Sequence, residues 1–464
     1  MQARGAHSLR GRWWVLGEAF EAAWGRCKRA WWVLQIQRRR RKPWDAKERR
    51  KKTKKRSRPA SAVGVDQLLA AAAAEELSRI AKNSVQDYKH AVKVEARGDF
   101  LEMEATDLET RMRVALNCEN ANGMAWAAIV DANKLKKALK PDKRSEADRA
   151  SFKLHETTKK LEVETDLTVK LPTAPGISPK EWPEREPECG RVAGEMAASH
   201  ETLEWLLRSV SNDETRYNLN GVWFDAAKKR MVSTDGHRAH LYHGHGCAKI
   251  PDPASKNNDR HDFIVSGATV TALARALKKM NGNAVWTLAV SSPKGMQDAM
   301  NLVEAGGLVG LGGMHGSFSV SGRTIDGQFP VIDAVIPDSY ELALRVSAGK
   351  LTKLLRRLKK ISDGGMFSTI EKTNGGIELA VMPGYKDASG KWVPKTSEAI
   401  CAECECEWDK ADAEFKIGVN LNYLLDAYEK LDGDTVELRF IDDLSPIVVL
   451  REPGYKALVM PQRM

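Results

Sequence analysis

Two stretches of the chain share one pattern of apolar and polar positions. In residues 232–242 an apolar run meets the pair Thr234-Asp235, turns, and continues as a second alternating run. A weaker copy occurs in residues 104–114, where Thr106-Asp107 takes the same place. Alternation with a period of two predicts strands, and a short polar break between two such runs predicts a turn. Two copies of one strand–turn–strand unit indicate an internal repeat.

Between these units the apolar positions recur with the period of a helix. We expect six helices, at Val65–Ile80, Asp131–Leu139, Ala197–Val210, Ala268–Met280, Ala348–Ile361 and Leu421–Leu431. Asp131 is the expected N-cap of the second helix. Strand-like runs follow each helix, among them one long strand at Leu161–Leu171. Six half-modules, each one helix backed by antiparallel strands, would pair into three domains of an α+β fold.

Length and composition agree with three domains. At roughly 150 residues per domain, 464 residues suffice for three, and an apolar share of 42% allows sizeable cores. The Pro-rich segments Pro172–Pro187 and Pro330–Pro337 are expected linkers. The predicted organisation is an N-terminal extension at residues 1–62, followed by domains at 63–187, 188–335 and 336–464. The glycine-rich run Gly306–Gly313 is expected to belong to a mobile insertion, at about residues 292–313, between strands.

The basic charge is concentrated at the N-terminus. Residues 1–60 hold 20 Lys and Arg against 4 Asp and Glu, whereas the remainder holds 53 basic and 58 acidic residues. Two Trp-Trp-Val-Leu blocks, at 13–16 and 31–34, would share one face of a helix. Such a basic amphipathic helix could touch a membrane or nucleic acid, and the alternative is a disordered arm. No apolar run approaches the length of about 20 residues that spans a bilayer, and seven cysteines suggest no disulfide scaffold, so a reducing cytosol is expected.

Lysine and arginine cluster on three of the predicted helices. The clusters are Lys134, Lys136, Lys137 and Lys140; Arg275, Lys278 and Lys279; and Lys350, Lys353, Arg356, Arg357, Lys359 and Lys360. Each could be an ordinary solvated helix face. Equivalent helices of a repeat could instead present these cations to one concave surface, which would neutralise phosphates without reading a base sequence.

The candidate reaction chemistry is weak. His237, His240, His243 and His245, with Cys247, could ligate zinc, but strand alternation would send neighbouring ligands to opposite faces. In the run from Ile400 to Trp408, Cys404 and Cys406 should share a half-buried face with Trp408, which favours packing over a thiolate metal site. The glycine-rich run lacks the Gly-Lys-Ser/Thr ending of a phosphate-binding loop. With no convincing catalytic constellation and no expected cofactor, the chain is better interpreted as a binding protein.

Several motifs in order resemble one known family. Arg216-Tyr-Asn-Leu-Asn-Gly221, Ser233-Thr-Asp-Gly-His-Arg238, Thr324-Ile-Asp-Gly-Gln-Phe-Pro330 and the ending Ala457-Leu-Val-Met-Pro-Gln-Arg-Met464 are similar to the bacterial DNA polymerase III beta subunit, the sliding clamp. The resemblance covers about residues 63–464. It implies a head-to-tail homodimeric ring of three like domains per chain, a non-catalytic processivity factor in the cytoplasm at the nucleoid. Duplex DNA would thread the ring, and the replicative polymerase and the clamp loader would bind it.

The resemblance also implies roles for particular residues. A pocket for partner peptides would comprise Arg216, Leu219, Thr234, Gly236, His237, Arg238, Pro330, Val335, Asn420, Tyr423, Leu444, Leu458, Val459, Met460, Pro461 and Arg463. Residues facing DNA would be Lys134, Lys136, Lys137, Tyr217, Arg275, Lys278, Lys279, Lys353, Arg356 and Arg357. The contact between protomers would join Leu167 and Val169 to Ile361. The alternative function is a metal-dependent nucleic-acid enzyme that uses the histidine cluster.

Overall fold

The computed structural model divides the chain into two units, residues 1–59 and 60–464. The structure describes residues 62–84, 88–119, 123, 125–142, 148–174, 177–183, 192–196, 198–225, 228–243, 262–280, 286–291, 302–309, 315–361, 367–382, 384–386, 392–394, 400–410, 414–429, 434–451 and 454–463. The predicted N-terminal arm, with its two Trp-Trp-Val-Leu blocks, lies outside these residues, so only the second unit is considered further. Within the described part, no helix is long and apolar enough to cross a membrane.

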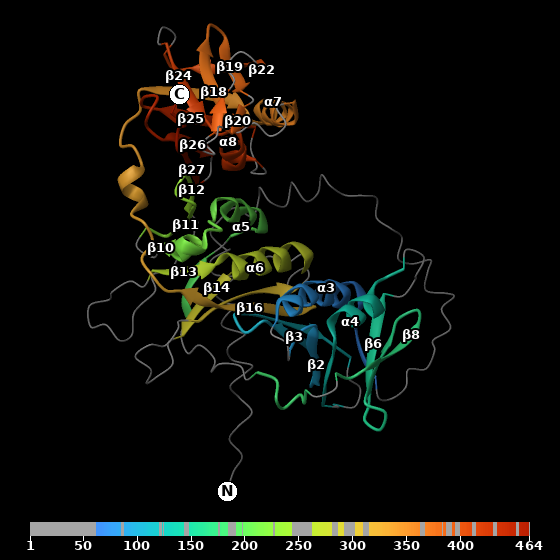
Figure 1. The fold of residues 1–464 in the computed structure, drawn as a ribbon. Coiled ribbons are helices and arrows are strands. Elements are labelled where there is room, and N and C mark those ends of the chain that lie inside the picture. The colour runs from blue at the N-terminus through green and yellow to red at the C-terminus, as the bar shows by residue number, and fades with distance from the viewer. Residues whose placement is uncertain are drawn as a thin grey trace, which may run out of the picture. The chain divides into compact units, whose positions relative to one another are not determined.

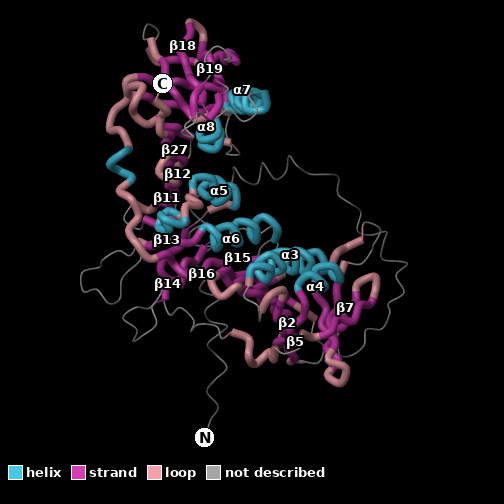
Figure 2. The backbone as a smooth tube through the Cα atoms, in the orientation of Figure 1, coloured by secondary structure: helices cyan, strands magenta, loops and turns pink. Residues whose placement is uncertain are grey.

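The second unit is built from six copies of one strand–helix–three-strand half-module (Figures 1 and 2). The first two copies are β1 (Val63–Asp66), α3 (Gln67–Asn83), β2 (Ala91–Arg97), β3 (Phe100–Thr106) and β4 (Thr110–Asn117), then β5 (Trp126–Asp131), α4 (Ala132–Leu139), β6 (Arg149–His155), β7 (Lys160–Glu164) and β8 (Thr168–Pro172). The next two are β9 (Val192–Met196), α5 (His200–Leu206), β10 (Gly221–Asp225), β11 (Arg230–Thr234) and β12 (Arg238–His243), then β13 (Phe263–Ser266), α6 (Gly267–Met280), β14 (Trp286–Ser291), β15 (Leu302–Val309) and β16 (Gly316–Ile325). The last two are β17 (Leu342–Ser347), α7 (Ala348–Ile361), β18 (Phe367–Thr373), β19 (Gly376–Met382) and β22 (Ile400–Glu405), then β24 (Lys416–Val419), α8 (Leu421–Tyr428), β25 (Thr435–Phe440), β26 (Ile447–Arg451) and β27 (Tyr455–Val459).

Smaller elements connect these copies. They are the 3₁₀ turns η2 (Leu207–Ser209), η3 (Glu214–Leu219) and η5 (Ile332–Val335), a two-stranded ribbon of β20 (Gly384–Lys386) and β21 (Trp392–Pro394), and the short strand β23 (Glu407–Trp408). The helices lie in consecutive pairs, α3 with α4, α5 with α6, and α7 with α8 (Figure 1). The predicted α+β fold of three tandem domains, each with two helices backed by antiparallel sheets, is therefore confirmed.

Paired half-modules exchange their first strands. In the first domain β5 joins the sheet of β2, β3 and β4, while β1 joins the sheet of β6, β7 and β8. The second domain repeats this exchange with β13 beside β10 and β9 beside β14, and the third repeats it with β24 beside β18 and β17 beside β25. All of these pairings are antiparallel. The exchange ties the two halves of each domain into one folding unit.

Strand pairing also continues across the joints between domains. β4 of the first domain pairs with β16 of the second over Thr110–Leu116 and Gly316–Gly322. β12 of the second domain pairs with β27 of the third over Arg238–Tyr242 and Tyr455–Val459. Each joint is therefore a backbone-hydrogen-bonded seam, which fixes the side chains on either side of it.

The same local chemistry starts each helix. Asp66, Asp131, Ser199 and Asn420 each accept a hydrogen bond from a backbone N–H of the first turn, and Asp131 confirms the predicted cap. Ser266 Oγ accepts from Thr269 N at 3.2 Å, and Ser347 Oγ from Lys350 N at 3.5 Å. Such caps satisfy donors that an isolated helix end leaves unpaired. The apolar faces then pack into a core whose largest buried side chains include Trp205, Tyr428, Phe152 and Phe440.

The two Thr-Asp turns have the same hydrogen bonds. Thr106 Oγ1 donates to Thr110 O, and Asp107 Oδ1 accepts from the N–H groups of Glu109 and Thr110. In the second copy Thr234 Oγ1 donates to Arg238 O at 2.6 Å, and Asp235 Oδ1 accepts from the N–H groups of His237 and Arg238. Asp442, between β25 and β26, accepts from Leu444 N and Ser445 N and forms a third copy that lacks the threonine. The predicted repeat thus holds at the level of single hydrogen bonds.

Three predicted elements are wrong in detail. The single strand at Leu161–Leu171 is two strands, β7 and β8, which a turn at residues 165–167 folds against each other. The helix at Ala197–Val210 ends at Leu206 and continues as the 3₁₀ turn η2. Gly306 and Gly307 lie in β15, paired with Ser319 and Phe318, rather than in an insertion without regular structure. The rest of the glycine-rich run, residues 310–313, lies outside the described residues.

The expected linker at Pro172–Pro187 is partly packed. Trp182 is buried and donates a hydrogen bond from Nε1 to Glu104 Oε1 at 2.7 Å, and its ring meets Tyr88 edge to face. The linker therefore attaches to the first domain before the chain enters the second.

Candidate functional site

The seam between the second and third domains gathers side chains from four elements. The turn that joins β11 to β12 lies against the last residues of the chain, where Met460 N donates to His237 O at 2.9 Å. Two residues later Gln462 N donates to Gly418 O, also at 2.9 Å, so the C-terminal segment runs past the end of β24. β24 leads directly into α8. The turn, the C-terminal segment and the start of α8 are therefore held together by backbone hydrogen bonds.

Arg238 is the centre of this group. Its side chain is 12% exposed, and it donates from Nε to Asp235 Oδ2 at 2.9 Å and from Nη1 to Asp426 Oδ2 of α8 at 2.6 Å. The guanidinium also lies 4.5 Å from the centre of the Tyr423 ring. Two ion pairs hold the N–H edge of the guanidinium, and the Tyr423 ring lies against it in a cation–π contact. Burial raises the pKa of the Tyr423 hydroxyl, which therefore stays a neutral hydrogen-bonding group at physiological pH.

Charges from neighbouring helices extend this centre into a network. Arg208 of η2 donates from Nη1 to Asp426 Oδ1 at 3.0 Å and to Glu429 Oε2 at 3.1 Å. Arg356 of α7 pairs with the other oxygen of Glu429. The pKa of Glu429 is lowered, because its hydrogen bonds to these arginines outweigh the cost of its burial. The network holds α8 against both the second domain and α7.

The predicted peptide-pocket residues differ in how accessible they are. Leu219, Thr234, Asn420, Leu458 and Val459 are buried. Arg238, Tyr423, Met460 and Pro461 are half-buried, and Arg216, Gly236, His237, Pro330, Val335, Leu444 and Arg463 are exposed. The buried members are out of direct reach of a ligand, whereas the others are accessible at the surface.

Direct contacts join part of the predicted set. The His237 ring lies 6.3 Å from the Tyr423 ring and nearly parallel to it. Arg216 lies beside Gly236, where a Cβ atom would come within 2.8 Å of its Nη1. Asn420 serves as the N-cap of α8, and Leu458 packs in a small cluster with Ile332 and Val448. Leu444 and Val335 remain at the surface, 66% and 44% exposed.

The predicted DNA-facing cations fall into two groups. Lys134, Lys137, Arg275, Lys353 and Arg357 are exposed, as is Tyr217. Lys136 is half-buried, and Lys278, Lys279 and Arg356 pair with Glu204, Glu75 and Glu429 on neighbouring helices. Ion pairs at an exposed surface are weak, typically below about 1 kcal/mol, so phosphates could displace them.

A broad cleft follows the basic face of α7. It has a volume of about 1230 Å³, and Lys350, Lys353, Arg356, Arg357 and Lys360 line one wall of it. Residues 373–376 and the edge strand β22 form the other wall. Two acidic residues, Glu403 and Glu405, also line the cleft, and Glu405 pairs with Lys350 at 2.8 Å. The cleft therefore carries excess positive charge.

The described histidines of the cluster do not form a metal site. His240 is completely buried, and its ring stacks on that of Trp205 with the ring centres 4.3 Å apart. Its Nδ1 donates a hydrogen bond to Trp205 O at 2.8 Å. Burial lowers the pKa of His240 to about 3. His237 and His243 lie at opposite ends of β12, and His245 and Cys247 lie outside the described residues. Within the described part, no three His, Cys, Asp or Glu residues are grouped as metal ligands, so the metal-enzyme alternative is not supported.

The cysteines in β22 and the one that follows it, Cys406, are free thiols. Cys404 is buried, as the strand pattern predicts, whereas Cys401 is exposed. Burial raises the pKa of Cys404 and raises that of Cys406 to about 12. Thiols that stay protonated are poor metal ligands and nucleophiles.

Comparisons with known proteins agree with this geometry. Residues 333–463 match the C-terminal domain of the DNA polymerase III beta subunit. The Beta sliding clamp of Caulobacter vibrioides is 31% identical over 263 residues, which are 55% of this chain and 61% of that protein. The Beta sliding clamp of Escherichia coli K12 is 25% identical over 274 residues, which are 58% of this chain and 64% of that protein. The matched part is thus less than two thirds of the length of either relative.

Solved structures match over more of the chain. The DNA polymerase III beta subunit of Thermotoga maritima superposes with a TM-score of 0.65 at 20% identity, over 87% of this chain and 99% of that one. The subunit of Pseudomonas aeruginosa gives the same TM-score and identity over 87% and 100%. These likenesses show the fold. The match at residues 333–463, the partial sequence relatives and the fold together make this chain similar to DNA polymerase III beta subunits.

Proposed function

We propose that this protein is a DNA sliding clamp, a non-catalytic subunit that encircles duplex DNA and tethers a replicative polymerase to it. The observation that carries the proposal is the pattern of free sheet edges. Both joints within the chain are closed by antiparallel strands, β4 with β16 and β12 with β27. The strands that close these joints are the last strands of four half-modules. Among the described strands, the last strands of the other two half-modules, β8 and β22, pair only with their own neighbours β7 and β19. One of these two free edges belongs to the first domain and one to the third.

A second copy of the chain would pair with these edges in the same way that strands pair at the internal joints, as antiparallel neighbours. Head-to-tail association brings β8 of one protomer to β22 of its partner, and a heterologous contact of this kind can close into a ring. Unpaired strand edges otherwise invite uncontrolled aggregation. Lys170 on β8 and Glu403 and Glu405 on β22 carry opposite charges. We propose a ring of two copies, with the three domains of each chain at 63–187, 188–335 and 336–464.

Exposed apolar side chains near these edges support the contact. Leu167, in the turn before β8, is 70% exposed, and Ile361, at the end of α7, is 54% exposed. Val169 is half-buried on β8 itself. Leu167→Asp should place a charge in the contact and shift sedimentation from dimer to monomer. Leu108→Asp, at a residue that is 44% exposed on a different turn, is the matched control and should leave the dimer intact.

The helix cations are proposed to face the threaded DNA. Lys134, Lys137, Arg275, Lys353 and Arg357 would neutralise phosphates without reading sequence, and Lys136, Lys278, Lys279, Arg356 and Tyr217 would add to this surface. Each neutralised phosphate contributes about −0.9 to the slope of log K against log salt. Replacing Lys353 and Arg357 with Gln should therefore reduce the slope by about 2.

The surface at the second Thr-Asp turn is proposed to dock peptide segments of the polymerase and of a clamp loader. Its half-buried apolar side chains, Met460 and Pro461, and its few oriented polar groups suit an apolar peptide. Tethering keeps the polymerase at a high effective concentration near its template, so a modest affinity suffices for long synthesis. We place this activity in the cytoplasm, at the nucleoid.

Primer extension with the polymerase and clamp loader of the source organism tests the function. The protein should lengthen the products made in a single binding event, and Met460→Ala should shorten them while loading onto DNA persists. Lys456→Ala, at a residue on the same strand as Leu458 and Val459, is the control and should act as wild type. Product lengths unaffected by the protein would contradict the proposal. Loss of stimulation on chelation, together with stoichiometric bound zinc, would favour a metal-dependent enzyme instead.

A further inference from the structure

The joint between the first and second domains repeats two contacts of the joint between the second and third. Arg323 N donates to Glu109 O at 3.3 Å, as Met460 N donates to His237 O at the other joint. The hydroxyl groups of Thr110 and Thr269 form a hydrogen bond at 3.1 Å, and these two residues correspond in position to Arg238 and Tyr423 at the other joint. These pairs stand at the same offsets from the two Thr-Asp turns and from the N-caps of α6 and α8. The surface proposed for partner peptides therefore has a structural counterpart in the chain.

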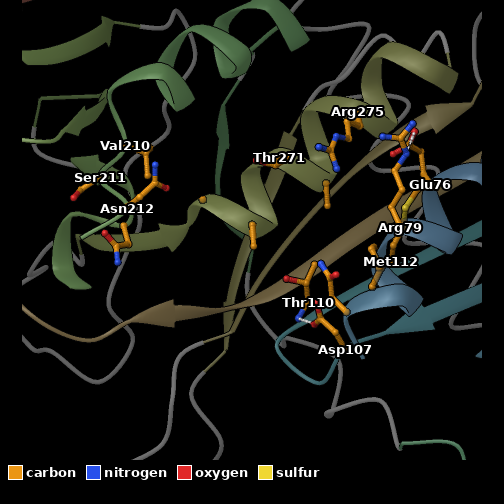
Figure 3. Close-up of a pocket in the computed structure, with 16 residues that line it drawn as sticks. Glu76, Arg79, Asp107, Thr110, Met112, Val210, Ser211, Asn212, Thr271 and Arg275 are labelled. Carbon is orange, nitrogen blue, oxygen red and sulfur yellow. Dashed lines mark hydrogen bonds and ion pairs between the residues drawn. The ribbon is translucent and has the colours of Figure 1, made fainter. Parts of the chain in front are cut away.

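A cleft opens at this counterpart, as Figure 3 shows. Its volume is about 460 Å³, and its walls come from the second half of α3, the first Thr-Asp turn, the first turns of α6 and residues 210–212. Ile80, Met112 and Val210 supply apolar wall. A cleft of this size, with apolar walls and a few polar groups, fits one or two peptide side chains.

Two acceptors in the cleft lack hydrogen bonds. Glu76 is 3% exposed, and its Oε1 accepts no hydrogen bond from the described residues, although Arg79 Nε lies 3.5 Å away. Asn220 Oδ1 is likewise buried without a hydrogen-bond partner in the described part. Burial raises the pKa of Glu76 despite the nearby positive charge of Arg79. A buried acceptor without a donor is unfavourable, and a ligand N–H that donates to it would recover this cost.

The charges of the lining select the type of ligand. Glu76 and Asp107 contribute two carboxylates, and Arg79 and Arg275 contribute two guanidinium groups. This balance gives no net preference for a cation or an anion. A carboxamide is neutral and carries two N–H donors beside one carbonyl acceptor, so it can serve acceptors and guanidinium groups together. The apolar wall would hold the methylene stem that carries it.

We propose that this cleft is a second docking site, which binds the glutamine side chain of a partner peptide. The cleft and its unpaired acceptors do not depend on the ring or on DNA. The choice of a peptide as the carrier rests on the proposed function, because it transfers the ligand class of one joint to the other. The two sites differ in chemistry, since the counterpart has Thr269 where the peptide surface has the aromatic Tyr423. They should therefore accept different peptides.

Fluorescence anisotropy of labelled peptides tests this proposal with the full chain. The probe is fluorescein-labelled Ala-Leu-Gln-Ala-Ala with an amidated end, compared with peptides that carry Leu, Glu or Lys in place of Gln. The Gln peptide should bind at least tenfold more tightly than each of the others. Ala272→Phe, which adds a ring to the cleft lining, should weaken its binding at least tenfold. Glu156→Phe, in the exposed turn between β6 and β7, is the control and should not change it.

A second variant guards against a folding defect. Glu76→Leu removes the unpaired acceptor and replaces it with an apolar side chain of similar size. It should also weaken the Gln peptide at least tenfold without lowering the thermal stability. Met460→Ala should leave its affinity within twofold. Equal binding of the Gln and Leu peptides, no binding at millimolar peptide, or unchanged binding to Ala272→Phe would overturn the proposal. Loss of binding in Met460→Ala would also overturn it, by placing the peptide at the other joint and leaving the clamp function standing.

Discussion

Arg230 is the side chain whose replacement should most weaken the attachment of the linker between the second and third domains. It is 2% exposed, and its Nε donates to Asp225 Oδ2 at 2.7 Å. Its Nη1 and Nη2 donate to the two oxygens of Asp333, in η5 of the linker, at 2.8 and 2.6 Å. Arg230→Met keeps the apolar stem but leaves the carboxylate of Asp225, itself 3% exposed, without its cation.

The expected cost follows from the burial of the three groups. Breaking a buried pair by removing one partner costs about 3–5 kcal/mol. Asp333 is 38% exposed and can regain water, so we expect the lower end, about 3 kcal/mol. For a cooperatively unfolding domain of about 150–250 residues, a loss of about 3 kcal/mol corresponds to a fall in melting temperature of about 6–12 °C. Hydrogen exchange should also become faster in residues 329–336 than elsewhere, because the linker loses its anchor.

Differential scanning calorimetry with a matched control measures this effect. Arg345 is 70% exposed and pairs with Glu437 at 2.9 Å, so Arg345→Met should change stability by less than about 1 kcal/mol. Adding Asp225→Asn to Arg230→Met should restore part of the loss, because it removes the uncompensated charge. Equal melting temperatures for Arg230→Met and Arg345→Met would refute the reasoning.

Three further predictions concern stability. Gly322→Ala should destabilise the protein by about 1–3 kcal/mol, because its Cβ would lie 2.1 Å from Thr269 Oγ1. Gly349→Ala is the control and should not destabilise it, because the nearest atom to its Cβ lies at 3.9 Å. Urea unfolding of the two variants measures the difference. Asp333 has a pKa well below its ordinary value because of Arg230, so its contribution to the free energy of unfolding should be present above about pH 4 and lost as the pH falls below it. Asp333→Asn should lower the melting temperature at pH 7 and abolish this part of the loss of stability in acid. Equal dependence of the melting temperature on pH in the variant and the wild type would contradict the assignment. His240 is buried as the neutral ring with its pKa lowered to about 3, so protonation favours the unfolded chain, and the free energy of unfolding should fall by about 2 kcal/mol between pH 7 and pH 5. In calorimetry, His240→Phe should make stability nearly independent of pH over this interval. The same pH dependence in the variant as in the wild type would count against the prediction.

The period of the apolar positions predicted the helices well. The bounds of α7, Ala348–Ile361, agree with the prediction at both ends, and Asp131 caps α4 as expected. Such elements are predictable because local propensity, amphipathic period and cap all point the same way. Where the structure differs from the prediction, a contact between separate segments of the chain determines the local conformation. The turn at residues 165–167 keeps the apolar alternation of the flanking strands in phase, so Leu161–Leu171 looks like one strand.

Glycine content was misleading in β15 for a similar reason. Gly306 and Gly307 suggest a loop, but the neighbouring strand offers complete backbone pairing through Phe318 and Ser319. Pairing within a sheet routinely overrides the low strand propensity of single residues.

The sequence predicted the site only in part. It singled out the turn around Thr234 and the residue Arg238, but it gave no sign of Asp426, which lies 188 positions away and holds the guanidinium in place. An isolated aspartate on a helix has no pattern that distinguishes a partner in an ion pair from a solvated charge. The counterpart cleft was missed as well, although the first Thr-Asp pair marked its position.

Retention on DNA tests the central claim most directly. The protein is loaded onto nicked circular duplex DNA, the complex is isolated by gel filtration in high salt, and a restriction enzyme then linearises half of the sample. A closed ring should stay on the circle and slide off the linear DNA, while Leu167→Asp, which opens the proposed contact, should be lost from both. Equal retention on circular and linear DNA, or none on either after loading, would contradict the account.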